Sequence, residues 1–194
     1  MNSRREKKVQ LREDQIIAVA VRLTETVGLA GLTMDMIADE TAIAKATLYT
    51  HFKSKDAIAS AIVLRVFNNM AAFIDQLQGD GITQLEAVVN YMLRSQDTQD
   101  GFSTVAMRDD FKAIVLEEPA VREVFMRTQA QLIRLIEQAK FEGDIAPELM
   151  NEAILSLLFG TRSLLVAAQA FDTPAQHDKI LQHGIQIFLR GIRP

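Results

Sequence analysis

Apolar residues recur at helical spacing through almost the whole chain, and this periodicity limits its fold more than any other feature. Ile16, Ala20, Leu23 and Val27 follow the i, i+4, i+7, i+11 spacing of one helix face. The nine glycines and four prolines lie mostly between the periodic segments, and no strand-like alternation persists. The pattern therefore predicts an all-α protein of about nine helices.

Capping residues and breaks give the expected boundaries. Gly28 is placed to end a first helix of about 14–27, Thr33 to cap a second, and Ser54 to cap a long fourth helix reaching about Leu77. The third helix covers about 45–51. After a break at 78–81 we expect helices at 82–96, 102–116, 119–141, 147–171 and 174–190, with Pro119, Pro147 and Pro174 in first turns. These boundaries predict two domains, 1–54 and 55–194, joined by the long helix.

The composition limits the cellular compartment in which the protein is expected. Its 194 residues include no cysteine, which excludes a disulfide scaffold and thiolate metal sites and fits a reducing cytoplasm. No apolar run reaches the roughly 18–20 residues of a membrane span. The basic start has no apolar segment behind it, so it does not resemble a signal peptide. We expect a cytoplasmic protein without a membrane partner.

The net charge of −4 averages two unlike parts. Residues 1–65 carry ten basic and eight acidic side chains, whereas residues 66–194 carry eleven and seventeen. A basic arm on a small module attached to an acidic body favours a phosphate-binding end. The alternative, a solvated disordered tail, stays open for the arm taken alone. The arm comprises Arg4, Arg5, Lys7, Lys8 and Arg12.

The most informative stretch is residues 33–55. Ile37 and Ala38 share a face of a short helix, and Leu48 follows after a tight turn, which is the spacing of a helix-turn-helix. If Leu48 and Phe52 face inward at i and i+4, the neighbouring Lys, Thr and Tyr side chains face outward. An exposed polar strip of this kind suits contact with phosphates and reading of the major groove.

A compound Tyr-x-His-Phe-x-x-Lys pattern makes this motif more specific than a generic helix-turn-helix. The matching residues are Gly28, Thr33, Ile37, Ala38, Thr47, Leu48, Tyr49, His51, Phe52, Ser54 and Lys55. With them, roughly residues 12–60 resemble the N-terminal module of the tetracycline-repressor (TetR) family. The resemblance implies a three-helix DNA-binding module joined by a long helix to a larger helical bundle for ligand binding and dimerisation.

The resemblance also implies residue roles. Thr33 would cap its helix and touch phosphate, Tyr49 and His51 would contact the DNA backbone, and Lys55 would bind another phosphate. Taken singly, Tyr49 and His51 are equally explained as packed surface residues, but their occurrence with Thr33 and Lys55 favours DNA contact. Lys45 and Thr47 would begin the recognition helix, and base reading would fall to Lys45, Ala46 and Thr50.

Three alanines depart from the family pattern. Ala42 stands where glycine is common in the turn, at a cost of about 1 kcal/mol if φ is positive there. Ala44 stands where serine often caps the recognition helix, which forfeits a cap worth about 1 kcal/mol. Ala46 stands at a third small-residue position, where the family pattern has glycine. These changes affect sequence preference more than fold.

The C-terminal bundle holds more apolar residues than a monomeric core explains, which favours a homodimer. Wide apolar faces on the last two helices, with Gly160 and Gly184 for close approach, predict a four-helix interface; a large monomeric core is the alternative. The interface candidates are Leu157, Thr161, Leu164, Leu181, Ile185 and Phe188.

The remaining helices offer a candidate effector pocket. Aromatic and methionine side chains suit an adaptable apolar cavity, although each is also explained as core. The candidates are Tyr91, Met92, Phe102, Met107, Phe111, Phe125, Met126 and Arg162. Arg162 lies among apolar neighbours and needs a partner, either a ligand carboxylate or a carboxylate of the protein.

No catalytic set emerges from the sequence. His177 and His183 are six residues apart rather than the four that place two ligands on one helix face. A site of histidines and carboxylates stays open, but no local spacing supports one. We therefore expect no enzyme activity, no metal and no cofactor.

Two functional hypotheses follow. The first is a ligand-responsive transcriptional regulator, favoured as a repressor, that binds a palindromic operator on double-stranded DNA as a dimer and is released by a small-molecule effector. The alternative is a helical protein-interaction or architectural DNA-binding module without a small-molecule effector.

Overall fold

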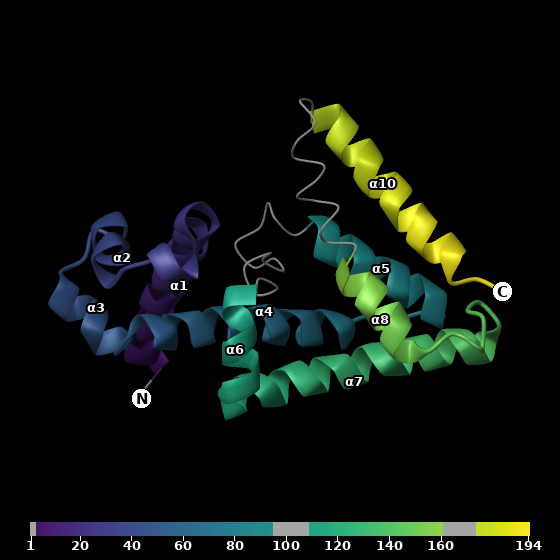
Figure 1. Ribbon diagram of the computed structural model, residues 1–194. Helices are drawn as coiled ribbons and strands as arrows, with labels where there is room; N and C mark the ends of the chain where they lie inside the picture. Colours follow the sequence, from purple (N-terminus) through teal and green to yellow (C-terminus); the bar gives the residue numbers. More distant parts are fainter. Residues whose placement is uncertain (1–2, 95–108, 161–173) are drawn as a thin grey trace. The chain divides into compact units, whose positions relative to one another are not determined.

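The computed structural model describes residues 3–94, 109–160 and 174–194, and nine helices lie within these ranges (Figure 1). No strand occurs among the described residues, so the expected all-α fold is confirmed there. The helices are α1 (Ser3–Gly31), α2 (Met34–Glu40), α3 (Lys45–His51), α4 (Lys55–Ile74), α5 (Gly81–Arg94), α6 (Asp109–Glu117), α7 (Pro119–Glu142), α8 (Asn151–Gly160) and α10 (Pro174–Gly191).

The helices form two compact units, and two helices contribute to both. The first unit contains α1, α2, α3, α6, the part of α4 up to Val66 and the part of α7 up to Phe125. The second contains the rest of α4 and α7 together with α5, α8 and α10. Within the first unit α1 packs against α2 and α6, and within the second α10 packs against α5.

Helix α1 begins at Ser3, so the expected start near Asp14 is wrong. The additional turns carry Arg, Glu, Lys and Gln, which are good helix formers but are exposed and show no apolar period. Gln10 Nε2 donates to Asp14 Oδ1 at 3.3 Å and joins the exposed turns to the buried ones. Gly28 adopts φ 72° and kinks the helix where its end was expected, but helical residues continue to Gly31.

Helix α4 begins as its cap predicts and supplies much of the core. Ser54 Oγ accepts a hydrogen bond from Ala57 N at 3.1 Å. The helix ends at Ile74 rather than near Leu77, where a tighter turn takes over and Leu77 N donates to Ile74 O. It is long and apolar enough to cross a membrane by length and composition, and half of its apolar stretch is buried inside the structure.

The start of α5 is held against the end of α7 by close contact and by hydrogen bonds. Gly81 N donates to Glu142 Oε2 at 2.6 Å, and a Cβ at position 81 would lie 2.7 Å from Ala139 Cα. Asp80 Oδ1 accepts from Thr83 N at 2.8 Å, and hydrogen bonds from Thr83 lower the pKa of the Asp80 carboxyl below its usual value.

The expected start of a helix at Pro147 is wrong, because α8 begins at Asn151. The intervening residues turn instead, with Leu149 N donating to Ala146 O at 3.2 Å. Lys140 Nζ holds this turn through Leu149 O at 2.6 Å, and Ala146 N donates to Ile192 O at 2.9 Å. The loop is therefore fixed by tertiary contacts that a local pattern does not contain.

The other late helices follow the expectation where the structure describes them. Helices α7 and α10 begin at Pro119 and Pro174, the prolines expected in their first turns. Residues 95–96, 102–108 and 161–171, for which helix was also expected, lie outside the described residues.

Candidate nucleic-acid interface

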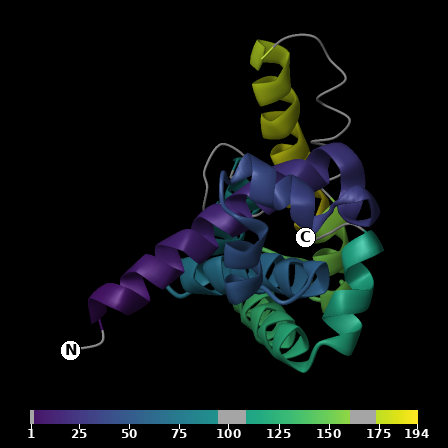
Figure 2. The ribbon, with the colours of Figure 1, turned by 90° about the vertical axis from the view of Figure 1, so that its left-hand side faces the viewer.

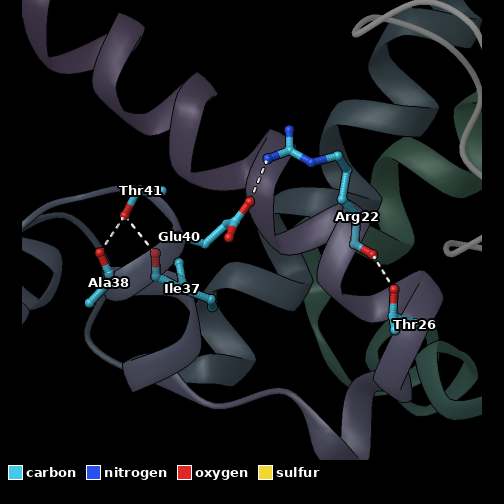
Figure 3. Close-up of polar contacts among 6 residues, drawn as sticks. All are labelled: Arg22, Thr26, Ile37, Ala38, Glu40 and Thr41. Atoms are coloured by element: carbon cyan, nitrogen blue, oxygen red, sulfur yellow. Dashed lines mark hydrogen bonds and ion pairs between the residues drawn. The ribbon is translucent and has the colours of Figure 1, made fainter.

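Helix α2 is capped at both ends by threonine. Figure 3 shows its C-terminal cap, Thr41, and the contact of Glu40 with Arg22 of α1. Thr33 Oγ1 accepts from Met36 N at 3.2 Å, so its expected capping role is confirmed. Thr41 Oγ1 donates to Ile37 O at 2.6 Å, which closes the last turn. At the same end, Arg22 of α1 contacts the carboxylate of Glu40 at 3.4 Å.

The turn between α2 and α3 is a Schellman motif with an alanine at its left-handed position. Ala42 N donates to Asp39 O at 3.1 Å and Ile43 N donates to Ala38 O at 3.0 Å, which are the two hydrogen bonds of that motif. Ala42 itself has φ 53°. The positive φ at the position where family members commonly have glycine is therefore confirmed.

Helix α3 buries one narrow face and exposes the rest. Leu48 and the following Phe52 are buried, as expected for inward positions at i and i+4. Ala44 precedes the helix as its N-cap with an extended backbone and makes no side-chain hydrogen bond, so the expected loss of a cap is confirmed. The exposed residues of α3 are Lys45, Ala46, Thr47, Tyr49 and Thr50.

Two exposed side chains of α3 already have partners inside the protein. Lys45 Nζ forms an ion pair with Asp35 Oδ1 of α2, and the hydrogen bond and negative charge of Asp35 raise the pKa of the Lys45 ammonium. Thr50 Oγ1 donates to Thr47 O at 2.6 Å, which leaves the Thr50 oxygen as an acceptor.

His51 and Lys55 are less exposed than the rest of the candidate surface. The His51 side chain is 14% exposed, and its Nδ1 lies 3.3 Å from Glu13 Oε1 of α1. Lys55 Nζ donates to the carbonyl oxygen of Leu29 at 3.0 Å, in the last turn of α1. Each residue therefore links the motif to α1, whatever it contacts on DNA.

The basic arm forms the exposed N-terminal turns of α1, which project beyond α2 and α3 in Figure 2. Arg4, Lys8 and Arg12 recur at i, i+4 and i+8 and so share one side of the helix, with Arg5 beside them. Glu6 lies about half a turn away, on the opposite side. The arm thus carries a continuous basic stripe.

The candidate pocket residues are distributed over both units. Phe111, buried, and Phe125 belong to the first unit. In the second unit Tyr91 stacks on Phe73 with ring centroids 4.3 Å apart, Met92 is buried, and Met126 is 57% exposed. Three further candidates lie outside the described residues: Phe102, Met107 and Arg162.

Two of the candidate dimer residues, Leu157 and Phe188, line a groove between α8 and α10. Leu181 and Ile185 are buried within the chain, Leu157 is 59% exposed, and Phe188 lines the groove. Thr161 and Leu164 lie outside the described residues. The groove has a volume of about 700 Å³ and is lined by Ser156, Leu157, Gly160, Ile180, His183, Gly184, Ile187, Phe188, Gly191 and Ile192.

Reasoning from sequence missed the groups that engage the candidate DNA-contacting side chains. The local pattern marks Asp35 only as a favourable charge in the first turn of α2, and it gives no role to Glu13 or to the Leu29 carbonyl. An acidic residue in the helix before the turn, opposite a lysine that begins the next helix, is a signal that could have identified Asp35.

No group of three or more His, Asp or Glu side chains is placed to hold a metal ion in the part of the chain that the structure describes.

Sequence comparison places the motif in a known group of regulators. Residues 16–62 match the family described as bacterial regulatory proteins, tetR family. Over 186 residues the chain is 21% identical to the uncharacterized HTH-type transcriptional regulator YvkB of Bacillus subtilis, covering 92% of this chain and 95% of that protein.

Solved structures share the fold over nearly the whole chain. The ketosteroid transcriptional regulator KstR2 of Mycobacterium tuberculosis superposes with a TM-score of 0.70 at 18% identity, covering 94% of this chain and 95% of its own. The fatty acid degradation regulator FadR from Bacillus halodurans gives 0.71 at 18% identity, covering 92% and 94%. These similarities extend the resemblance from the motif to the fold of the chain.

Proposed function

We propose that the chain, whose residues 16–62 match the tetR family, is a DNA-binding repressor that a small-molecule effector releases from a palindromic operator. The observation that carries the proposal is the exposed face of α3, which follows the Schellman turn and displays polar side chains around the buried Leu48. A short helix with this exposure suits the major groove.

We assign the DNA contacts by position on this face. Lys45, Ala46 and Thr50 read bases. Backbone phosphates are contacted by Thr33, Thr47, Tyr49, His51 and Lys55. His51 acts through Nε2, since its Nδ1 faces Glu13, and the Lys55 ammonium has donors beyond the one that Leu29 accepts.

A second copy of the chain occupies the groove between α8 and α10. Leu157 and Ile187 both line it and are 59% and 72% exposed, so the groove offers apolar surface that a partner could cover. A twofold dimer presents two recognition helices to half-sites about 34–36 Å apart, or a multiple of that distance, and so requires a palindromic operator.

The effector binds in the C-terminal bundle, among apolar side chains such as Tyr91 and Met92. The fold shared with regulators named for ketosteroid and fatty acid pathways supports an apolar or amphipathic ligand. Helix α4 contributes residues to both units, so we assign it the coupling between effector and DNA. A ligand that prefers the state with low operator affinity releases the protein by linkage.

The protein acts in the cytoplasm.

Selection of bound fragments from a genomic DNA library tests this function. We expect enrichment of one palindrome near a promoter, protected from nuclease over two half-sites. Uniform recovery of fragments would instead support an architectural DNA-binding module.

Lys55→Ala is expected to weaken binding to every fragment and to reduce its salt dependence, because a phosphate contact carries no sequence information.

The dimer is tested separately by light scattering of the full chain. Ile187→Asp places a charge beside the groove and is expected to shift the protein from dimer to monomer, whereas Glu152→Gln on the exposed start of α8 leaves the dimer intact. A monomeric wild-type protein would contradict the dimer, and with it the palindrome.

A further inference from the structure

The ion pair between Asp35 and Lys45 lies across the two helices of the DNA-binding motif. Asp35 is in the first turn of α2 and Lys45 is the first residue of α3, so the pair bridges the turn on its outer side. Both side chains are more than half exposed, at 65% and 55%. The Asp35 carboxylate is therefore paired with the Lys45 ammonium on the surface that DNA would cover.

Lys45 is paired with a charged group, whereas the partners of Lys53 and Lys55 are neutral. Lys53 Nζ donates to the carbonyl oxygen of Tyr49 at 3.1 Å, and Lys55 Nζ donates to that of Leu29 at 3.0 Å. Backbone carbonyls are neutral, so these two ammonium groups keep their net charge toward phosphate. The charge of Lys45 is balanced by a full carboxylate instead.

We propose that Asp35 is a specificity-determining residue, which holds Lys45 in an intramolecular ion pair and thereby lowers affinity for DNA of arbitrary sequence. DNA must displace the carboxylate before Lys45 can contact it. A correctly placed base acceptor replaces the ion pair with a directed hydrogen bond, whereas a non-specific phosphate replaces it only with a similar point-charge contact. In either complex Asp35 is left facing a polyanion, and only the directed hydrogen bond offsets that cost.

The balance of charge also reduces the salt dependence of non-specific binding. A lysine that neutralises a phosphate releases condensed counterions, at roughly 0.9 per neutralised phosphate on duplex DNA. When Lys45 leaves Asp35, the carboxylate needs a new cation, which cancels that release. Because of Asp35, Lys45 therefore adds little to the affinity for non-specific DNA or to the salt dependence of that binding. The proposal rests on the DNA-binding function proposed above.

The test uses the full chain and a non-palindromic duplex of random sequence, with binding followed by fluorescence anisotropy between about 50 and 200 mM salt. Asp35→Asn is expected to tighten non-specific binding about 2–5-fold per subunit, the range expected of an exposed ion pair, and to steepen the salt dependence by about one ion per subunit. The matched control is Asp39→Asn, an exposed acidic residue on the same helix that acts on Lys45 only through its charge and without a hydrogen bond.

A double-mutant cycle isolates the pair from the general effect of removing a negative charge. In a Lys45→Met background, Asp35→Asn is expected to lose most of its effect, while Asp39→Asn keeps its own small effect. Thermal unfolding of each variant checks that the motif remains folded.

Two failures are distinguishable. If wild-type protein binds DNA, and Asp35→Asn and Asp39→Asn tighten binding equally both with Lys45 present and in the Lys45→Met background, Asp35 acts only as a nearby negative charge and the proposal is wrong. If neither the wild type nor any variant binds duplex DNA at low salt, the DNA-binding function fails as well.

Discussion

Ala42 combines a left-handed backbone with a side chain, at the turn that sets α3 against α2. Its φ of 53° meets the needs of the Schellman hydrogen bonds, but in an L-residue this conformation brings Cβ close to the following carbonyl. The residue is exposed, so neighbouring side chains do not compensate for the strain. The motif therefore keeps its geometry at some cost in stability.

Ala42→Gly is expected to raise the free energy of unfolding by about 0.5–1 kcal/mol, because relief of the strained φ exceeds the greater chain entropy of glycine. Chemical denaturation of the full chain measures the change. Ala46→Gly, at an exposed position inside α3, is the matched control and is expected to lower stability by about 1 kcal/mol. Destabilisation by Ala42→Gly would contradict a strained turn.

At the scale of single residues, the sequence predicts local geometry better than partners. The left-handed turn at Ala42 and the missing cap at Ala44 follow from positions within one short motif. The contacts of Lys45 with Asp35 and of Lys55 with Leu29 depend on how helices pack, and the latter pair lies 26 positions apart in the chain. Such contacts need the tertiary fold before they can be identified.

At the scale of helices, boundaries were predictable where a cap or a proline marks them. The starts of α2, α4, α7 and α10 carry such marks. The start of α1 does not, because its first turns are charged and exposed and have no apolar period. The start expected for α8 was wrong for another reason: Lys140 and Ile192 hold the preceding loop in a turn that Pro147 alone did not reveal.

Gly81 gives a test at the scale of helix packing. Gly81→Ala is expected to lower the free energy of unfolding by about 1–3 kcal/mol, because its Cβ would lie 2.7 Å from Ala139 Cα and force α5 away from α7. Differential scanning calorimetry measures the loss. Gly191→Ala is the control, since a Cβ there has nothing within 4 Å. Equal stability of the two variants would show that the contact yields easily.

At the scale of the whole molecule, the uneven distribution of charge matches the predicted separation into a DNA-binding end and a C-terminal bundle. The N-terminal residues 1–65 are net basic and contain the motif, while residues 66–194 are net acidic. An acidic body keeps the rest of the protein away from a polyanion and leaves one end to bind it. The overall charge of −4 therefore says little about the DNA-binding end.

The basic arm at the start of α1 gives the corresponding prediction. Replacing Arg4, Arg5, Lys7 and Lys8 together by Gln is expected to weaken binding to all DNA sequences and to reduce the salt dependence by about 0.9 for each phosphate that the arm no longer neutralises. Stability should change little, since these side chains are exposed. Glu6→Gln, on the opposite side of the helix, is the control. An unchanged salt dependence would identify the arm as a solvated extension.

Glu13 and Asp14 stand next to each other on α1 and hold two different helices, through His51 at the end of α3 and through Arg65 in α4. Lys55 adds a second link between α4 and α1. For protein engineering, these three links make α1, α2, α3 and α4 up to Val66 the natural cassette for exchange between regulators. A graft cut at residue 54 would sever two of the links, whereas one cut after Val66 carries all three.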